Sequence, residues 1–335
     1  MGIDLSLIWA IIIIFGVMMY VVMDGFDLGI GILFPFTPKN QDRDVMMNTV
    51  APVWDGNETW LVLGGAGLFA AFPLAYAVVL SALYIPLILM LIGLIFRGVA
   101  FEFRFKAKMD KQHIWDKAFI GGSLLATFSQ GVALGAYIDG IKVVGRAYAG
   151  GPFDWLTPFS LFCGLGLIAA YAMLGCTWLI MKTGGELQER MHQLAKPLTF
   201  VLLAFVGAVS IWTPLAHGAI ATRWFTLPNL FWFLPVPILV VVATIGLIKA
   251  VAQKAHYMPF LLTLLLIFLG YSGLGISLWP NIIPPAVSIW DAASPPQSQA
   301  FVLVGTLFIL PCILVYTFWS YYVFRGKVTI DDGYH

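Results

Sequence analysis

Charged residues are scarce in this chain of 335 residues, where Asp, Glu, Lys and Arg make up 10% and apolar residues make up 60%. Soluble domains carry roughly 25% charged residues. A chain with so little charge cannot hide its apolar residues inside one water-facing globule. The composition therefore predicts a polytopic membrane protein and excludes a nucleic-acid-binding domain. The first apolar run lacks a preceding basic residue and a small-residue cleavage site, so we expect a retained span.

Cysteine and histidine are also few, with three and five residues. The cysteines lie singly within apolar stretches, at spacings that do not fit a metal site. No two histidines fall on membrane helices that could face each other, as a buried bis-histidine haem would require. We therefore expect that this chain binds no haem or metal of its own.

Nine apolar stretches are long enough to cross about 30 Å of hydrocarbon as helices. They cover residues 5–34, 50–71, 74–101, 115–137, 158–181, 197–214, 230–250, 258–279 and 300–324. Short loops join them, so we predict an all-α fold in a single integral membrane domain over residues 1–335. An eight-span alternative holds if the sixth stretch is re-entrant.

Basic residues fall almost entirely in one set of loops. Of the eighteen, all but Lys142, Arg146 and Arg223 lie on one side of the predicted membrane. Cytoplasmic loops carry the excess of Lys and Arg. The sequence therefore predicts an N-terminus outside and a C-terminus in the cytoplasm.

Acidic residues gather at the cytoplasmic ends of the first three predicted spans. Ionisable groups inside a membrane are costly, and they often mark proton relays. A chain of carboxyl groups with unequal proton affinity is what a proton inlet needs. The residues that we expect to form this proton path are Asp24, Asp27, Asp55, Glu58 and Glu102.

Spacing groups four of these acids into two pairs. Asp24 with Asp27, and Asp55 with Glu58, are three residues apart, which puts each pair on one helix face. Two negative charges about 6 Å apart repel by roughly 3 kcal/mol at an effective dielectric of about 20. A proton bound by one member of a pair removes this repulsion.

Structural roles compete with this interpretation. Asp55-Gly-Asn-Glu58 fits a capping box, with Asp55 as the N-cap and Glu58 three residues later. Arg97 and Glu102 fit positions at the water boundary, with Arg97 snorkelling. Asp24 is hardest to explain structurally, because an unpaired carboxylate deep in a span costs about 2.5 to 3.5 kcal/mol.

Four motifs occur along the chain: Asp24-Gly-Phe-Asp27-Leu-Gly, Ala51-Pro-Val-Trp54-Asp55-Gly-Asn57-Glu58-Thr-Trp60, Phe96-Arg97-Gly-Val-Ala-Phe-Glu102-Phe-Arg104 and Trp290-Asp291-Ala292. Together, in this order and at comparable spacing along the whole chain, they resemble subunit II of the cytochrome bd quinol oxidases. The short loops look most like the cyanide-insensitive branch of that family.

The resemblance implies part of a heterodimeric terminal oxidase in the bacterial inner membrane. Such a complex oxidises ubiquinol or another quinol, reduces dioxygen to water and generates proton-motive force. Haems b and d and the active centre belong to subunit I, so no catalytic residue is expected in this chain. The resemblance also implies two four-helix bundles plus a peripheral helix, and a bound quinone or lipid. The resemblance does not decide whether a small accessory subunit is also part of the complex.

The resemblance also assigns roles to residues. Asp55 would be the main proton-path acid, with Asp24 and Asp27 as its neighbours and Glu102 at the inner mouth. Family members often have Asp at the position of Glu102 and a residue other than Glu at position 58. The expected supporting residues are Trp54, Asn57, Trp60, Arg97, Trp290 and Asp291.

Two other functions fit the acids. A proton-coupled secondary transporter also places acids beside glycines in a span, although an odd number of spans and the lack of a visible inverted repeat count against it. A pure assembly scaffold would need none of the acids for turnover.

Overall fold

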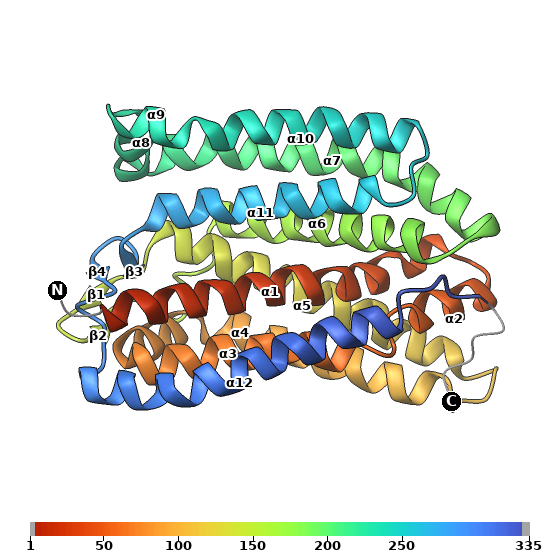
Figure 1. Ribbon diagram of the computed structural model, residues 1–335, viewed down its shortest axis with the longest axis horizontal. Helices are drawn as coiled ribbons and strands as arrows, with labels where there is room; N and C mark the ends of the chain where they lie inside the picture. The colour runs from red at the N-terminus through yellow and green to blue at the C-terminus, as the bar shows by residue number, and fades with distance from the viewer. Residues whose placement is uncertain (1–3, 330–335) are drawn as a thin grey trace.

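The computed structural model describes residues 4–329, and long helices running along one axis dominate it (Figure 1). The long helices are α1 (Leu5–Leu33), α3 (Trp54–Ala71), α4 (Pro73–Arg104), α5 (Gln112–Asp139), α6 (Pro158–Lys182), α7 (Gly185–Ala216), α10 (Pro235–Ala252), α11 (Met258–Leu278) and α12 (Pro296–Val323). Shorter elements are the 3-10 helix η1 (Phe34–Phe36), α2 (Asn40–Asn48), α8 (Gly218–Phe225), α9 (Asn229–Phe233) and the strands β1 (Val143–Val144), β2 (Ala147–Tyr148), β3 (Asn281–Ile283) and β4 (Val287–Ser288).

Among the described residues, eight helices are long and apolar enough to cross a membrane, one fewer than the sequence predicted. The difference lies in α3, whose first turns carry Asp55, Asn57 and Glu58 and lower its apolar content. The sixth predicted stretch does not account for it. Residues 197–214 belong to α7, a helix of 32 residues that is itself a candidate span.

The two ends of the molecule differ in their elements. The antiparallel hairpins β1–β2 and β3–β4 lie at one end with α8 and α9, and α2 lies at the other with the end of α12 (Figure 1). We call these the hairpin end and the α2 end. At the hairpin end, Thr157 and Ser160 form a capping box that begins α6, with Pro158 at its first position.

Helix α1 packs against α3, α5 and α6. Its contact with α6 is close enough that only glycine fits, because a Cβ on Gly29 would lie 1.9 Å from the Tyr171 carbonyl oxygen. On the other side of this contact, a Cβ on Gly175 would lie 2.5 Å from the backbone of Gly29. Small residues permit such close approach between membrane helices. The crossing fixes which face of α1 turns toward α3 and α4.

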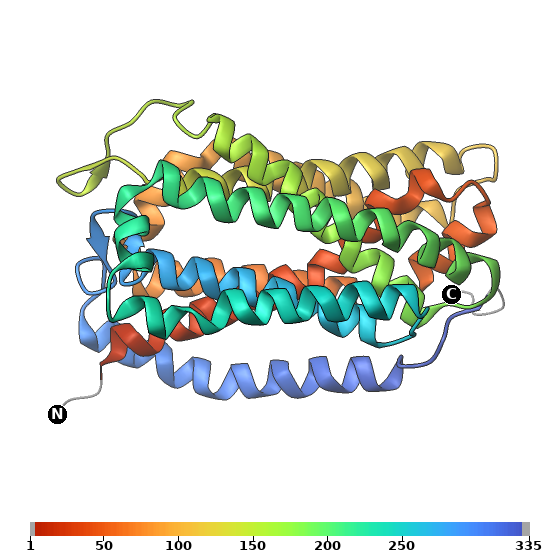
Figure 2. The same cartoon turned by 90° about the horizontal axis from the view of Figure 1, so that it is seen from above.

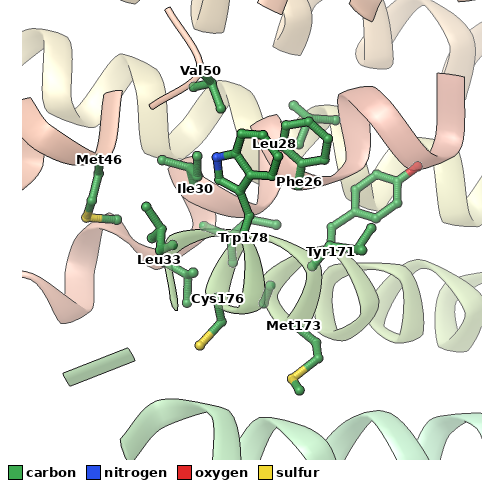
Figure 3. Close-up of a cluster of buried hydrophobic side chains, with 14 of the residues drawn as sticks. Phe26, Leu28, Ile30, Leu33, Met46, Val50, Tyr171, Met173, Cys176 and Trp178 are labelled. Carbon is green, nitrogen blue, oxygen red and sulfur yellow. The ribbon is translucent and has the colours of Figure 1, made fainter. Parts of the chain in front are cut away.

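A cluster of buried hydrophobic side chains fills the junction of α1 and α6 (Figure 3). Phe26 stacks on Trp178 with ring centroids 4.2 Å apart. The Trp178 Nε1 donates to Thr49 Oγ1 at 3.2 Å, which joins this core to the end of α2. This packing surrounds the segment of α1 that carries Asp24 and Asp27.

Helix packing divides eight of the long helices into two sets. α1, α3, α4 and α5 pack together and form what we call the inner set, and α5 and α1 also contact α6. α6, α7, α10 and α11 pack in turn on one another and form what we call the outer set. α12 lies along the outside of the molecule and contacts α1 and α3 (Figure 2).

Candidate functional site

An arginine joins two carboxylates from different helices toward the α2 end. Arg97 on α4 places Nη1 2.7 Å from Asp24 Oδ1 on α1 and Nη2 2.7 Å from Glu58 Oε1 on α3. Arg97 and Asp24 are fully buried, and the Glu58 side chain is 26% exposed. Two acids that are 34 residues apart therefore share one guanidinium.

Asp27 belongs to the same buried region but has a different partner. Asn57 Nδ2 donates to Asp27 Oδ2 at 2.8 Å. The Tyr321 hydroxyl on α12 in turn donates to Asn57 Oδ1 at 2.8 Å. Asp27 Oδ1 is buried and has no hydrogen-bond partner within residues 4–329. We call Asp24, Asp27, Glu58 and Arg97 the acid cluster.

Aromatic rings surround the acid cluster. The Arg97 guanidinium carbon lies 5.6 Å from the centre of the Trp54 ring, within cation–π range. Trp54 stacks on Phe101 at 5.1 Å. Trp60 is buried six residues farther along α3 and meets Phe15 edge to face at 5.8 Å. The Trp54 ring, itself stacked on Phe101, therefore covers one side of the Arg97 guanidinium.

A second group of polar side chains lies beside Asp24. Tyr20 is next to Asp24 on α1. Gln130 Nε2 on α5 donates to the Tyr20 hydroxyl at 2.6 Å, and the Tyr171 hydroxyl on α6 donates to Gln130 Oε1 at 3.0 Å. Sequence reasoning missed all three residues, because single Tyr and Gln residues in apolar helices carry no spacing signal.

Two of the five predicted acids lie outside the acid cluster. Asp55 is exposed on α3 and makes no ion pair within the described part of the chain. Glu102 is exposed near the end of α4 and pairs with Lys106 at 3.4 Å. The structure therefore brings three of the five acids together and leaves these two outside that group. Both side chains are exposed, whereas Arg97 is fully buried.

The capping-box interpretation of Asp55-Gly-Asn-Glu58 is wrong as well. Helix α3 begins at Trp54 with Val53 as its N-cap, and no side chain in the described part of the chain caps it. Asp55 is already the second residue of the helix, and Glu58 pairs with Arg97 instead of the helix start. Arg97 does not snorkel either, since it is fully buried. The ion pair between α3 and α4, and not the local sequence pattern, therefore determines where the Glu58 and Arg97 side chains lie.

Trp290 and Asp291 lie at the hairpin end, far from the acid cluster. Trp290 Nε1 donates to Asp4 Oδ2 at 2.8 Å, which ties the start of α1 to the loop before α12. Asp291 Oδ2 accepts from the Ser288 hydroxyl at 2.5 Å. The bond from Trp290 holds the pKa of Asp4 below its usual range, and the bond from Ser288 does the same for Asp291.

A separate set of ion pairs joins η1, α2, α4 and α5 at the α2 end. Arg104 pairs with Asp116, at 2.5 Å from Nε, and with Asp44. Arg43 Nη1 lies 2.7 Å from the other oxygen of Asp116 and also bonds the Thr37 carbonyl. Arg104 is fully buried. The sequence indicated basic loops here but not this balanced network.

Metal-binding groups are not found in the described residues, where no three His, Cys, Asp or Glu side chains come together to hold an ion. One histidine, His335, lies outside those residues. The absence of haem from this chain stays a prediction. A groove of about 440 Å³ opens at the hairpin end between α1, α8, α9 and α11, and Arg223, Asn229 and Trp279 are among its lining residues.

Fold and site define an all-α, multi-pass membrane protein that buries a network of ionisable side chains toward one end. Comparison with known families narrows this class. The model of the family "Cytochrome bd terminal oxidase subunit II" matches residues 5–324. This chain therefore belongs to the cytochrome bd terminal oxidase subunit II family.

Relatives match along nearly the whole chain. Cytochrome bd-I ubiquinol oxidase subunit 2 of Escherichia coli K12 is 29% identical and covers 98% of this chain and 96% of its own length. A probable cytochrome oxidase subunit 2 of Haemophilus influenzae is 30% identical, with 99% and 98% covered. A chain of the bd oxidase structure from Geobacillus thermodenitrificans shares the fold, with a TM-score of 0.76 at 16% identity over 96% of this chain and 98% of its own.

Proposed function

We propose that this chain is the haem-free subunit II of a bacterial inner-membrane oxidase that oxidises ubiquinol or a related quinol and reduces dioxygen to water. Haems b and d and the active centre would belong to a partner, subunit I, and this chain would supply protons from the cytoplasm. The names of the E. coli and Bacillus subtilis relatives, both ubiquinol oxidase subunits, support the substrate. The acid cluster around Arg97 is the observation that supports the proton path.

Stability alone does not explain the acid cluster. Replacing a buried ion pair by well-packed apolar residues is often neutral or stabilising. A chain with 10% charged residues nevertheless brings Asp24, Asp27, Glu58 and Arg97 together inside the membrane region. Intramembrane carboxylates of this kind form proton relays in pumps and transporters.

The exposed and buried acids suggest an order along the path. Asp55 and Glu102 lie exposed toward the α2 end and would collect protons at the inner mouth. Glu58, partly exposed, would pass them to the buried Asp24 and Asp27. This order keeps Asp55 as the main acid at the surface of the chain and makes Arg97 the group that holds the inner acids in place.

One face of α3 supports docking of subunit I. Asp55, Thr59, Val62, Gly65 and Phe69 are exposed along it. A carboxylate that faced lipid in a span would cost about 2.5 to 3.5 kcal/mol. Apart from its own helix, no part of residues 4–329 lies within 4 Å of where a Cβ on Gly65 would be, so another helix can approach closely. A polar partner surface over this face removes the cost.

The complete topology is part of this proposal. α3 would be the ninth span, because it runs beside α1 and α4. The inner and outer sets would form two four-helix bundles with α12 peripheral, in a single membrane domain with the N-terminus outside and the α2 end in the cytoplasm.

Short loops favour the cyanide-insensitive branch, which cyanide titration of the oxidase tests. A small accessory subunit, if it is part of the complex, would copurify with the oxidase.

A quinone or lipid bound to this chain also remains a proposal. The groove beside Arg223 is the described hollow in which to look for it, since its walls include Ile14, Phe233 and Ile276 and its rim includes Asn229. Mass spectrometry of the purified complex, with and without an Arg223→Ala substitution, tests whether the molecule binds there.

The experiment for the proton path uses the whole purified complex in vesicles. Asp55→Asn and Asp24→Asn should each reduce turnover and proton uptake at least tenfold while the haem bands stay. Asp110→Asn is the matched control, because Asp110 is exposed in the loop before α5. Unchanged turnover in Asp55→Asn would support a scaffold instead. A colourless protein that purifies without a partner and moves a solute would support the transporter.

A further inference from the structure

Tyr321 reaches the acid cluster from the outermost helix. Gln299 is the only buried residue within α12 (Pro296–Val323), so this helix shares little of the core. Yet the Tyr321 ring packs edge-on against Phe26 at 6.4 Å and Trp178 at 6.2 Å. Its hydroxyl is therefore held at a fixed place, where it donates to Asn57 at 2.8 Å.

A small notch lies between α3 and α12 beside this hydrogen bond. Its volume of about 10 Å³ is close to the minimum that holds one water molecule. Gly56, Asn57, Thr317, Ser320 and Tyr321 are among its lining residues and provide several polar groups. A water needs two to four such partners to stay in a site. The notch therefore suits one water molecule near the α2 end.

The Asn57 side chain separates this notch from Asp27. Its amide oxygen accepts from Tyr321 on the notch side, and its amide nitrogen donates to Asp27 on the other. An amide carries no readily ionisable proton, so it interrupts proton transfer in this position. Asp27 Oδ1, buried and without a hydrogen-bond partner in the described chain, is left to receive a proton.

We propose that Asn57 is a gate between a one-water site at the α3–α12 notch and Asp27, and that Tyr321 is the latch that keeps the gate closed. When the amide turns away, water in the notch contacts the Asp27 carboxylate. A hydronium O–H bond then breaks as an O–H bond forms on Asp27, which leaves neutral water and a neutral carboxyl group. This role rests on the proposed proton function of the acid cluster.

The test follows hydrogen–deuterium exchange of the Asp27 carboxyl group by infrared difference spectroscopy on the whole complex. Asp27→Asn identifies the band by its loss. Tyr321→Phe keeps the ring packing and removes only the latch, so exchange should be at least tenfold faster. Tyr316→Phe is the control, since Tyr316 lines the same notch from the same helix, is 63% exposed and makes no hydrogen bond to Asn57 within residues 4–329. It should exchange at the wild-type rate.

Two results would overturn the latch. One is an exchange rate in Tyr321→Phe equal to that of wild type and Tyr316→Phe; the other is the absence of any exchangeable carboxyl band that Asp27→Asn removes. Should Tyr321→Phe not assemble, Asn57→Ser gives the same reading, because serine cannot span both partners and should also speed exchange. If Asp24→Asn and Asp55→Asn leave proton uptake unchanged, the proposed function is wrong. The exchange rate of the Asp27 carboxyl group in Tyr321→Phe still tests, independently, whether Tyr321 acts as a latch.

Discussion

Replacing Arg97 by Gln tests whether the acid cluster is a single electrostatic unit. Arg97 Nη1 and Nη2 each lie 2.7 Å from a carboxylate oxygen, on Asp24 and Glu58, and Arg97 and Asp24 are fully buried. Removing one member of a buried pair leaves an uncompensated charge and costs about 3 to 5 kcal/mol. We expect Arg97→Gln to lower the free energy of unfolding of the complex by about this amount.

A double-mutant cycle separates pairing from packing. In Arg97→Gln combined with Asp24→Asn the fully buried Asp24 charge is gone and only the partly exposed Glu58 is left without its cation. The double variant should therefore be more stable than the sum of the single effects predicts, by about 0.5 to 3 kcal/mol. Unfolding of the purified complex at neutral pH, followed through its haem absorbance, measures each variant.

Additive effects, within about 0.3 to 0.5 kcal/mol, would refute the pairing of Arg97 with Asp24. Arg97→Lys is the matched control. It keeps the positive charge but lacks the planar fork that reaches two carboxylates at once. Its loss of stability should therefore lie between wild type and Arg97→Gln.

Two further predictions concern helix packing and the hairpin end. Gly29→Ala should sharply reduce the yield of assembled complex on size exclusion, because its Cβ would meet the Tyr171 carbonyl at 1.9 Å, whereas Gly273→Ala enters open space and should not. The hydrogen bond from Ser288 lowers the pKa of Asp291 below its ordinary value of 3.8. Its contribution to stability is therefore present above pH 3.8 and is lost as the pH falls through the pKa of Asp291 in the folded protein. Unfolding midpoints of wild type and Asp291→Asn should differ at neutral pH and converge in acid; a difference that persists in acid would contradict this.

Sequence reasoning identified the acids and Arg97 but not how they pair. Asp24 and Arg97 are 73 residues apart, and the predicted orientation placed them at the same end of the membrane. Which oxygens meet depends on how α1 and α4 rotate about their axes. That rotation follows from contacts such as the one between Gly29 on α1 and Tyr171 on α6, which local patterns do not encode.

Local rules failed where tertiary contacts were stronger. The pattern around Asp55 fits a capping box, yet Glu58 gains more from Arg97 than from the start of its own helix. Tyr321 gave no signal because its partner Asn57 lies 264 residues away. Helix existence, by contrast, followed from composition: α6 covers residues 158–182 against an expected 158–181.

The network around Arg104 shows what a structural ion cluster looks like in this protein. Arg43 and Arg104 face Asp44 and Asp116, so two positive charges meet two negative ones. Every acid has its own cation, and the network ties η1, α2, α4 and α5 together. No proton is needed to balance it.

The acid cluster lacks this balance. Asp24 and Glu58 pair with the single cation Arg97, whereas Asp27 makes no ion pair within residues 4–329 and accepts a hydrogen bond from the Asn57 amide. With all three acids ionised the cluster carries a formal excess of two negative charges in a region largely closed to water. Binding a proton relieves that excess and releasing it restores the excess, whereas a cluster that served only as a tie between helices would be built like the one at Arg104. The difference in charge balance between two neighbouring networks in one chain therefore favours a proton-carrying role for the acid cluster.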